Sequence, residues 1–148
     1  MIPDQIEREI LINAPIEKLW AVLTEAEHLP RGSSQATATV DLRPGGLIDL
    51  RWEEWGTFLF RIVQVEPMRF FSFLWARPTD VEPVAGNSTL VEFTLTPEGE
   101  GTRLRVVESG FRDLDLPDEE KIARATENIG GWEEQLAEIQ AYAEMLAA

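Results

Sequence analysis

The sequence predicts an α+β domain in which a seven-stranded antiparallel sheet curves around one long C-terminal helix. Two patterns predict it. Much of the chain between residues 6 and 109 alternates apolar and polar side chains with the period of a strand. From residue 118 onward, apolar side chains recur at the spacing of a helix. A sheet and a helix that are each apolar on one side bury those sides against one another.

The composition is that of a single folded domain spanning residues 1–148, because 44% of the residues are hydrophobic. The formal net charge of -14 repels phosphate backbones and anionic lipid surfaces, so we expect no nucleic-acid partner. The absence of cysteine excludes disulfides, thiol catalysis and thiolate metal sites. We see no transmembrane span and no signal peptide, and we therefore expect a cytoplasmic protein.

The N-terminal region predicts a strand followed by two short helices. Residues 6–12 alternate as a strand does, and Pro15 suits the first turn of a helix whose apolar face extends to Leu23. Thr24 to Glu27 has the S/T-x-x-E form of a capping box, which predicts a second short helix. That second helix is expected to end at Pro30.

Six further strands are expected between residues 35 and 109. The sequence "RPGG" at Arg43 to Gly46 predicts a type II turn between the first two of them. The sequence "PEGEG" predicts the turn of the last hairpin, whereas two prolines mark residues 76–86 as an irregular loop. The expected strands are residues 35–42, 47–53, 57–66, 69–75, 88–96 and 102–109.

The C-terminal region carries an apolar stripe that continues through Gly130 and Gly131. A break in the helix would reset the phase of the stripe, so we predict one long helix or two nearly collinear ones. Glycine in a helix interior costs about 1 kcal/mol relative to alanine, so we expect close approach of the sheet or of another occupant here. A helix that begins near Asn128 is the alternative. The stripe consists of Ile122, Ala125, Ile129, Trp132, Leu136, Ile139, Ala143 and Leu146.

Four short motifs in this order resemble a known family. They are "NAPIEKLWAVLT" at residues 13–24, "RPGG" at 43–46, "SGF" at 109–111 and "GGW" at 130–132. The chain resembles the START-like superfamily of helix-grip folds, and within it the branch of homologues of the heat-shock-protein-90 ATPase activator. The resemblance implies a hydrophobic cavity between the sheet and the C-terminal helix. Members of the superfamily bind lipids, hormones or polyketides, and some are cyclases.

Aromatic side chains are the candidates for the walls of such a cavity. An indole offers a flat apolar surface with one polar N–H group. The alternative is that these rings only fill the core. The predicted wall residues are Trp52, Phe71, Phe73, Trp75 and Trp132.

Arg51 and Glu108 are the candidate polar groups of the cavity. Arg51 faces inward in one strand register, where it would hold an acidic head group, and faces solvent in the other, which we favour. Glu108 shares the parity of Leu104 and Val106, so it is expected on the concave side, partly solvated at the mouth of the cavity. A buried carboxylate there could act as an acid or a base, but a single acid does not make an active site.

Metal and histidine chemistry are not expected. His28 is the only histidine, so a site with two histidine ligands is excluded by count, and we expect His28 to be an exposed side chain. The acidic residues between 113 and 120 lack the spacing of a calcium loop. We therefore predict no metal, no cofactor and no catalytic residue.

The function expected from the sequence is the binding of a small hydrophobic molecule, lipid-like or aromatic, without catalysis. One alternative is a protein-interaction module of the co-chaperone type, acting through its surface. Another is an enzyme similar to polyketide cyclases or dehydratases. A homodimer is compatible with the exposed edge strands that we expect.

Overall fold

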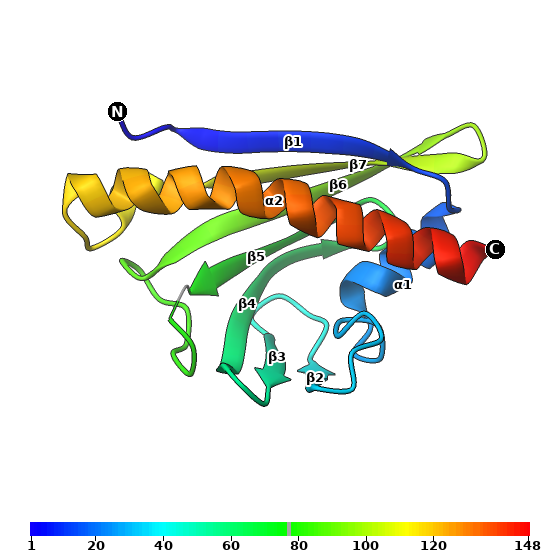
Figure 1. Ribbon diagram of the computed structural model, residues 1–148, viewed down its shortest axis with the longest axis horizontal. Helices are drawn as coiled ribbons and strands as arrows, with labels where there is room; N and C mark the ends of the chain where they lie inside the picture. Colours follow the sequence, from blue (N-terminus) through cyan, green and yellow to red (C-terminus); the bar gives the residue numbers. More distant parts are fainter. Residues whose placement is uncertain (77) are drawn as a thin grey trace.

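The computed structural model describes residues 1–76 and 78–148, which form one sheet and two α-helices (Figure 1). The N-terminal elements are β1 (Gln5–Ile12) and α1 (Ile16–Thr24). The central elements are β2 (Ala36–Val40), β3 (Leu47–Trp52), β4 (Gly56–Glu66) and β5 (Phe70–Ala76). The C-terminal elements are β6 (Ser88–Glu98), β7 (Gly101–Ser109), the short 3-10 helix η1 (Phe111–Asp113) and α2 (Asp118–Ala147).

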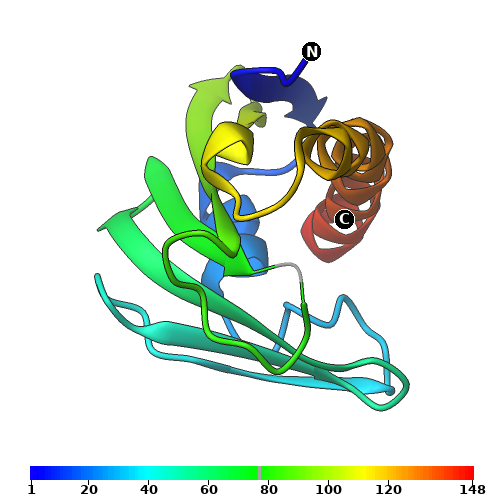
Figure 2. The ribbon, with the colours of Figure 1, turned by 90° about the vertical axis from the view of Figure 1, so that its left-hand side faces the viewer.

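The seven strands form one antiparallel sheet in the order β1-β7-β6-β5-β4-β3-β2, which confirms the predicted sheet. A register shift between Ile62 and Gln64 interrupts the β4–β5 ladder. Such bulges increase the local twist of a strand, which helps this sheet to curve. Figure 2 shows the sheet curving from β1 beside α2 to β2 and β3, which lie well away from the helix.

Helix α2 is continuous for 30 residues and passes through both glycines, which confirms the prediction of one long helix. It packs against β1, α1 and η1. Its buried side chains recur at helical spacing, because a helix packed on one side buries one stripe. They are Ala125, Asn128, Trp132, Leu136, Ile139 and Ala143, five of which belong to the predicted stripe.

The turn at "RPGG" has the predicted type II geometry. Gly45 has a φ of 85°, a value that L side chains rarely adopt, and the Gly46 amide donates to the Arg43 carbonyl at 2.9 Å. The turn therefore needs glycine at position 45, and the hairpin pairs β2 with β3, with Val40 opposite Ile48.

The prediction of a second short helix after β1 was wrong, since residues 25–35 contain only turns. Thr24 is the last residue of α1 rather than the first cap of a new helix. Its hydroxyl donates back to the Trp20 carbonyl at 2.7 Å, inside the helix that it ends. The chain then turns at Arg31 and Gly32, which both have positive φ angles, 50° and 81°.

Charged side chains cover the outer face of β1 and β7. Arg103 and Arg105 point outward, as the alternation predicts, and pair with Glu9 and Glu7 of the neighbouring strand. The hydrogen bond from Arg105 lowers the pKa of the Glu7 carboxyl below its ordinary value. The opposite face of the same strands is buried and faces α2.

Candidate functional site

A cavity of about 900 Å³ lies between α2 and the concave face of the sheet. It exists because α2 packs against β1 and α1, whereas the sheet curves away from the helix toward β2 and β3 (Figure 2). Small-molecule sites are commonly 300–1,000 Å³ in volume and predominantly apolar. Its aromatic lining residues are Trp52, Trp55, Phe58, Phe60, Phe71, Phe73, Trp75, Phe93, Trp132 and Tyr142.

All five predicted wall residues border this cavity. Strand alternation explains the contribution of the sheet, because Phe71, Phe73 and Trp75 point to the same side of β5. Trp132 approaches from α2 and lies edge-to-face against Trp75 and Phe93, with ring centroids 6.2 and 5.8 Å apart. Edge-to-face contacts stabilise aromatic pairs, so the rings brace one another around the cavity.

Glu108 lies behind this wall in a network of buried hydrogen bonds. We expected its side chain to be partly solvated at the mouth of the cavity, but the residue is only 1% exposed. Oε1 accepts from Trp132 Nε1 at 2.8 Å, and Oε2 accepts from Thr89 Oγ1 at 2.6 Å. Asn128 Nδ2 donates to both oxygens at 3.0 Å. The carboxylate therefore joins β6, β7 and α2 and fixes the orientation of the Trp132 indole.

Arg51 takes the outward of its two predicted orientations. It is exposed, and its Nε donates to Thr57 Oγ1 at 3.3 Å, whereas its neighbours Leu50 and Trp52 line the cavity. Successive side chains of a strand point to opposite faces of the sheet, so a residue between two inward-pointing neighbours points outward.

Among the described residues, Arg31, in the turn after α1, is the arginine that lines the cavity. Its Nη1 donates to Gln135 Oε1 at 2.7 Å and to Glu138 Oε2 at 3.1 Å, which ties this turn to α2. Burial lowers the pKa of the guanidinium, and the nearby Glu138 carboxylate offsets part of that effect. Arg31 is thus one of several polar residues in a lining that also includes Glu127, Glu134 and Glu138 of α2.

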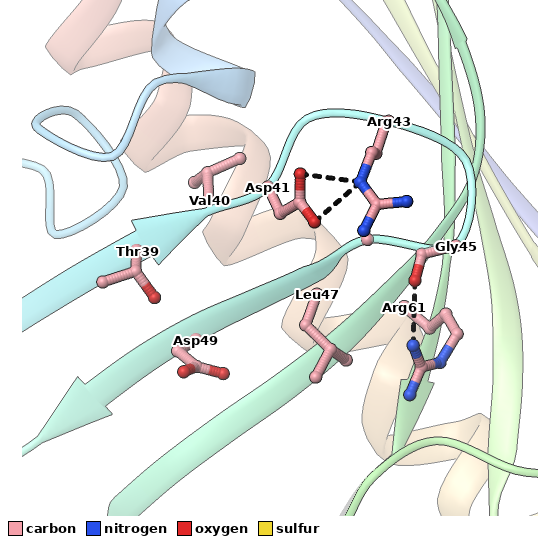
Figure 3. A pocket seen from close by; sticks show the side chains of 9 residues that line it. Thr39, Val40, Asp41, Arg43, Gly45, Leu47, Asp49 and Arg61 are labelled. Atoms are coloured by element: carbon pink, nitrogen blue, oxygen red, sulfur yellow. Dashed lines mark hydrogen bonds and ion pairs between the residues drawn. The ribbon is translucent and has the colours of Figure 1, made fainter.

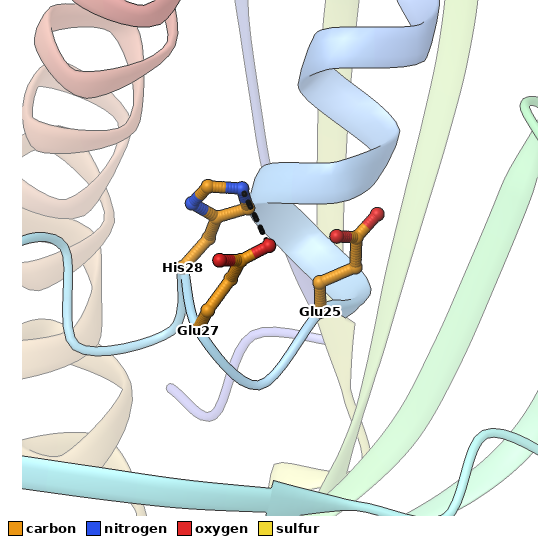
Figure 4. Close-up of side chains that lie close together, drawn as sticks. All are labelled: Glu25, Glu27 and His28. Carbon is orange, nitrogen blue, oxygen red and sulfur yellow. Dashed lines mark ion pairs between the residues drawn. The ribbon is translucent and has the colours of Figure 1, made fainter.

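His28 is not the exposed side chain that we expected. Its side chain is 17% exposed, and Nδ1 lies 2.9 Å from the hydroxyl of Tyr142 in α2. Glu25 and Glu27 bring carboxylate oxygens within 4.8 Å of the ring (Figure 4). Both acids are exposed, and a Glu27 carboxylate oxygen lies 3.7 Å from His28 Nε2. We assign this cluster to the attachment of the turn to α2 and keep the prediction of no metal.

A second depression, of about 410 Å³, lies at the β2–β3 hairpin (Figure 3). Three of its four charged lining residues are already engaged, whereas the buried Asp49 Oδ1 has no hydrogen-bond partner among the described residues. Asp41 pairs with Arg43 at 2.9 Å, and Arg61 donates to the Gly45 carbonyl and pairs with Glu82. Aromatic walls are absent from its described lining, so it lacks the apolar surface of the larger cavity.

The sequence patterns did not identify Thr89, Asn128 or Arg31 as parts of this site. Asn128 had a detectable signal, since it is one helical turn before Trp132 and is a poor helix former in a helix interior. Arg31 had none, because its position depends on a turn that the capping-box pattern assigned to a helix.

None of the described helices has the combination of length and apolar character required to cross a membrane. No curated protein matches the chain. Solved structures do match it, and a protein from Mesorhizobium loti, MLL2253, has 23% sequence identity and a TM-score of 0.75, with 95% of this chain and 97% of that chain covered.

Two further structures share the fold at similar distance. CalU16 from Micromonospora echinospora has 24% identity and a TM-score of 0.68, covering 96% of this chain and 78% of that one. The Aha1 dimer from Colwellia psychrerythraea has 19% identity and a TM-score of 0.68, covering 92% of each chain. Identities at this level establish the fold only.

A family model gives the more specific assignment. The model described as "Activator of Hsp90 ATPase homolog 1-like protein" matches residues 13–144, nearly the whole chain. The match includes the four motifs noted in the sequence and every element from α1 to most of α2. The protein therefore belongs to the family of Activator of Hsp90 ATPase homolog 1-like proteins.

Proposed function

We propose that this protein binds a small, largely apolar molecule in the cavity between α2 and the sheet, without catalysing a reaction on it. The observation that carries the proposal is the size of the cavity together with its aromatic lining. Burial of about 200 Å² of apolar ligand surface would contribute about 5 kcal/mol to binding. Arg31 and Asn128 are among the polar lining groups that could orient the ligand.

The surroundings of Glu108 support binding rather than acid–base chemistry. Both carboxylate oxygens accept hydrogen bonds from protein donors, and Glu108 is not among the described residues that line the cavity. A general acid or base must come within hydrogen-bond distance of a reacting atom. A carboxylate held behind Trp132 serves instead to position the wall.

Trp75→Ala tests the proposal, with Leu74→Ala as its control. These residues are adjacent in β5, but only Trp75 lines the cavity. We expect Trp75→Ala to weaken binding of the uncharged fluorescent probe N-phenyl-1-naphthylamine about tenfold or more, because one wall is lost. Leu74→Ala, on the outer face, should leave the dissociation constant within about twofold.

The stability of the Trp75 variant is expected to fall only moderately. Trp75 is partly exposed, and its buried Nε1 has no hydrogen-bond partner among the described residues, so the substitution also removes an unsatisfied donor. We expect a loss of about 2 kcal/mol in urea unfolding, below the 3–5 kcal/mol usual for a buried tryptophan. Saturable probe binding that is equal in all three proteins would place the probe elsewhere and contradict the proposed site.

A further inference from the structure

Two adjacent glycines in the middle of α2 have no explanation in the packing of the protein. Each costs helix stability relative to alanine, and the helix is continuous through both. A Cβ atom built on Gly130 or Gly131 would have no heavy atom of the described chain within 4 Å, apart from the neighbouring residues and the backbone of the helix itself. The close approach of the sheet that we expected at these positions is therefore absent.

The two glycines differ in what they face. Gly131 lines the cavity, whereas Gly130 is exposed and is not among the described residues of the lining. Gly131 directly precedes Trp132, and the residues one turn away on either side of it, Asn128 and Gln135, also line the cavity. The bare backbone at Gly131 is therefore a gap in the side-chain lining of α2, next to an indole that Glu108 holds in place.

We propose that Gly131 determines which molecules the cavity accepts, because the ligand packs directly against the helix backbone at this position. The inference rests on the proposed binding function and extends it to a specific contact. A side chain at position 131 would occupy volume that the ligand uses. A side chain at position 130 would extend into solvent and leave the cavity unchanged.

Substitutions at positions 130 and 131 form a matched pair. Both should raise the stability of the protein, but only substitutions at position 131 should weaken ligand binding. Alanine or leucine at either position should raise the urea midpoint of unfolding, since both are better helix formers than glycine. For N-phenyl-1-naphthylamine, we expect Gly131→Ala to weaken binding about threefold and Gly131→Leu about tenfold or more. Gly130→Ala and Gly130→Leu should bind it within about twofold of the wild type.

The outcomes separate this inference from the function on which it rests. If the wild type and all four variants bind the probe equally, the inference is overturned while the proposed function stands. If the Gly131 variants are less stable than the wild type, the protein itself needs glycine there, and the inference is again overturned. If the wild type shows no saturable binding, the proposed function fails and the inference fails with it. A more stable Gly131→Leu protein with weakened probe binding would support both.

Discussion

Glu108→Ala is expected to lower the free energy of unfolding by about 3–5 kcal/mol, the largest effect of any substitution considered for this protein. Glu108 is almost completely buried and accepts hydrogen bonds from Thr89, Asn128 and Trp132. Truncation would leave three buried donors without their acceptor and would open a void between the sheet and α2. Each unsatisfied buried donor costs about 1–3 kcal/mol, so the losses combine to a large total.

Urea unfolding of three variants measures this effect. Glu92→Ala is the control, because Glu92 lies on β6 between buried residues that point the other way, and we expect it to cost less than about 1 kcal/mol. Glu108→Gln should fall between the two, since the amide retains an acceptor oxygen but directs a donor at other donors. A cost below about 1 kcal/mol for Glu108→Ala would contradict the hydrogen-bond network described above.

Trp132→Ala is expected to reduce both stability and ligand binding. Trp132 is 8% exposed, so it belongs to the core, and it also lines the cavity. The substitution should cost about 3–4 kcal/mol, which combines lost packing with the loss of a donor to Glu108. Binding of N-phenyl-1-naphthylamine should weaken about tenfold or more, because the indole is a wall of the proposed site.

Trp132→Phe separates the ring from its N–H group. It keeps most of the aromatic surface but removes the hydrogen bond to Glu108 Oε1, so we expect a cost of about 1–2 kcal/mol. Because Glu108→Ala and Trp132→Phe remove the same bond, their combined cost should be about 1 kcal/mol less than the sum of the single costs. Strict additivity would mean that Glu108 does not act on Trp132. Unchanged probe binding in a folded Trp132→Ala protein would remove Trp132 from the site.

Periodic patterns in the sequence were sufficient to predict most of the fold. The alternation along β5 correctly placed Phe71, Phe73 and Trp75 on one face, and the α2 stripe correctly continued through Gly130 and Gly131. Such patterns report which side of an element is buried, and a curved sheet with one long helix offers few arrangements that bury all of those sides.

Local motifs and single polar residues were less informative. The capping-box pattern at Thr24 was misleading, because its hydroxyl can bond backward to Trp20 as readily as forward, and the choice depends on tertiary contacts of the following turn. The parity of Glu108 gave its direction, but not its depth or its partners. Those partners lie on β6 and α2, and only the assembled fold brings them to the same place.

The central claim is that the cavity holds a small apolar molecule, and native mass spectrometry of the purified protein tests it most directly. We expect a population heavier than the apo mass by one small molecule, which denaturing extraction should release and identify as largely apolar. Gly131→Leu protein prepared in the same way should carry less of that molecule than Gly130→Leu protein. A wild-type protein at its apo mass, with no thermal shift across a library of lipids and aromatic compounds, would contradict the claim. That result would favour the protein-interaction alternative, which predicts a stable complex with a chaperone.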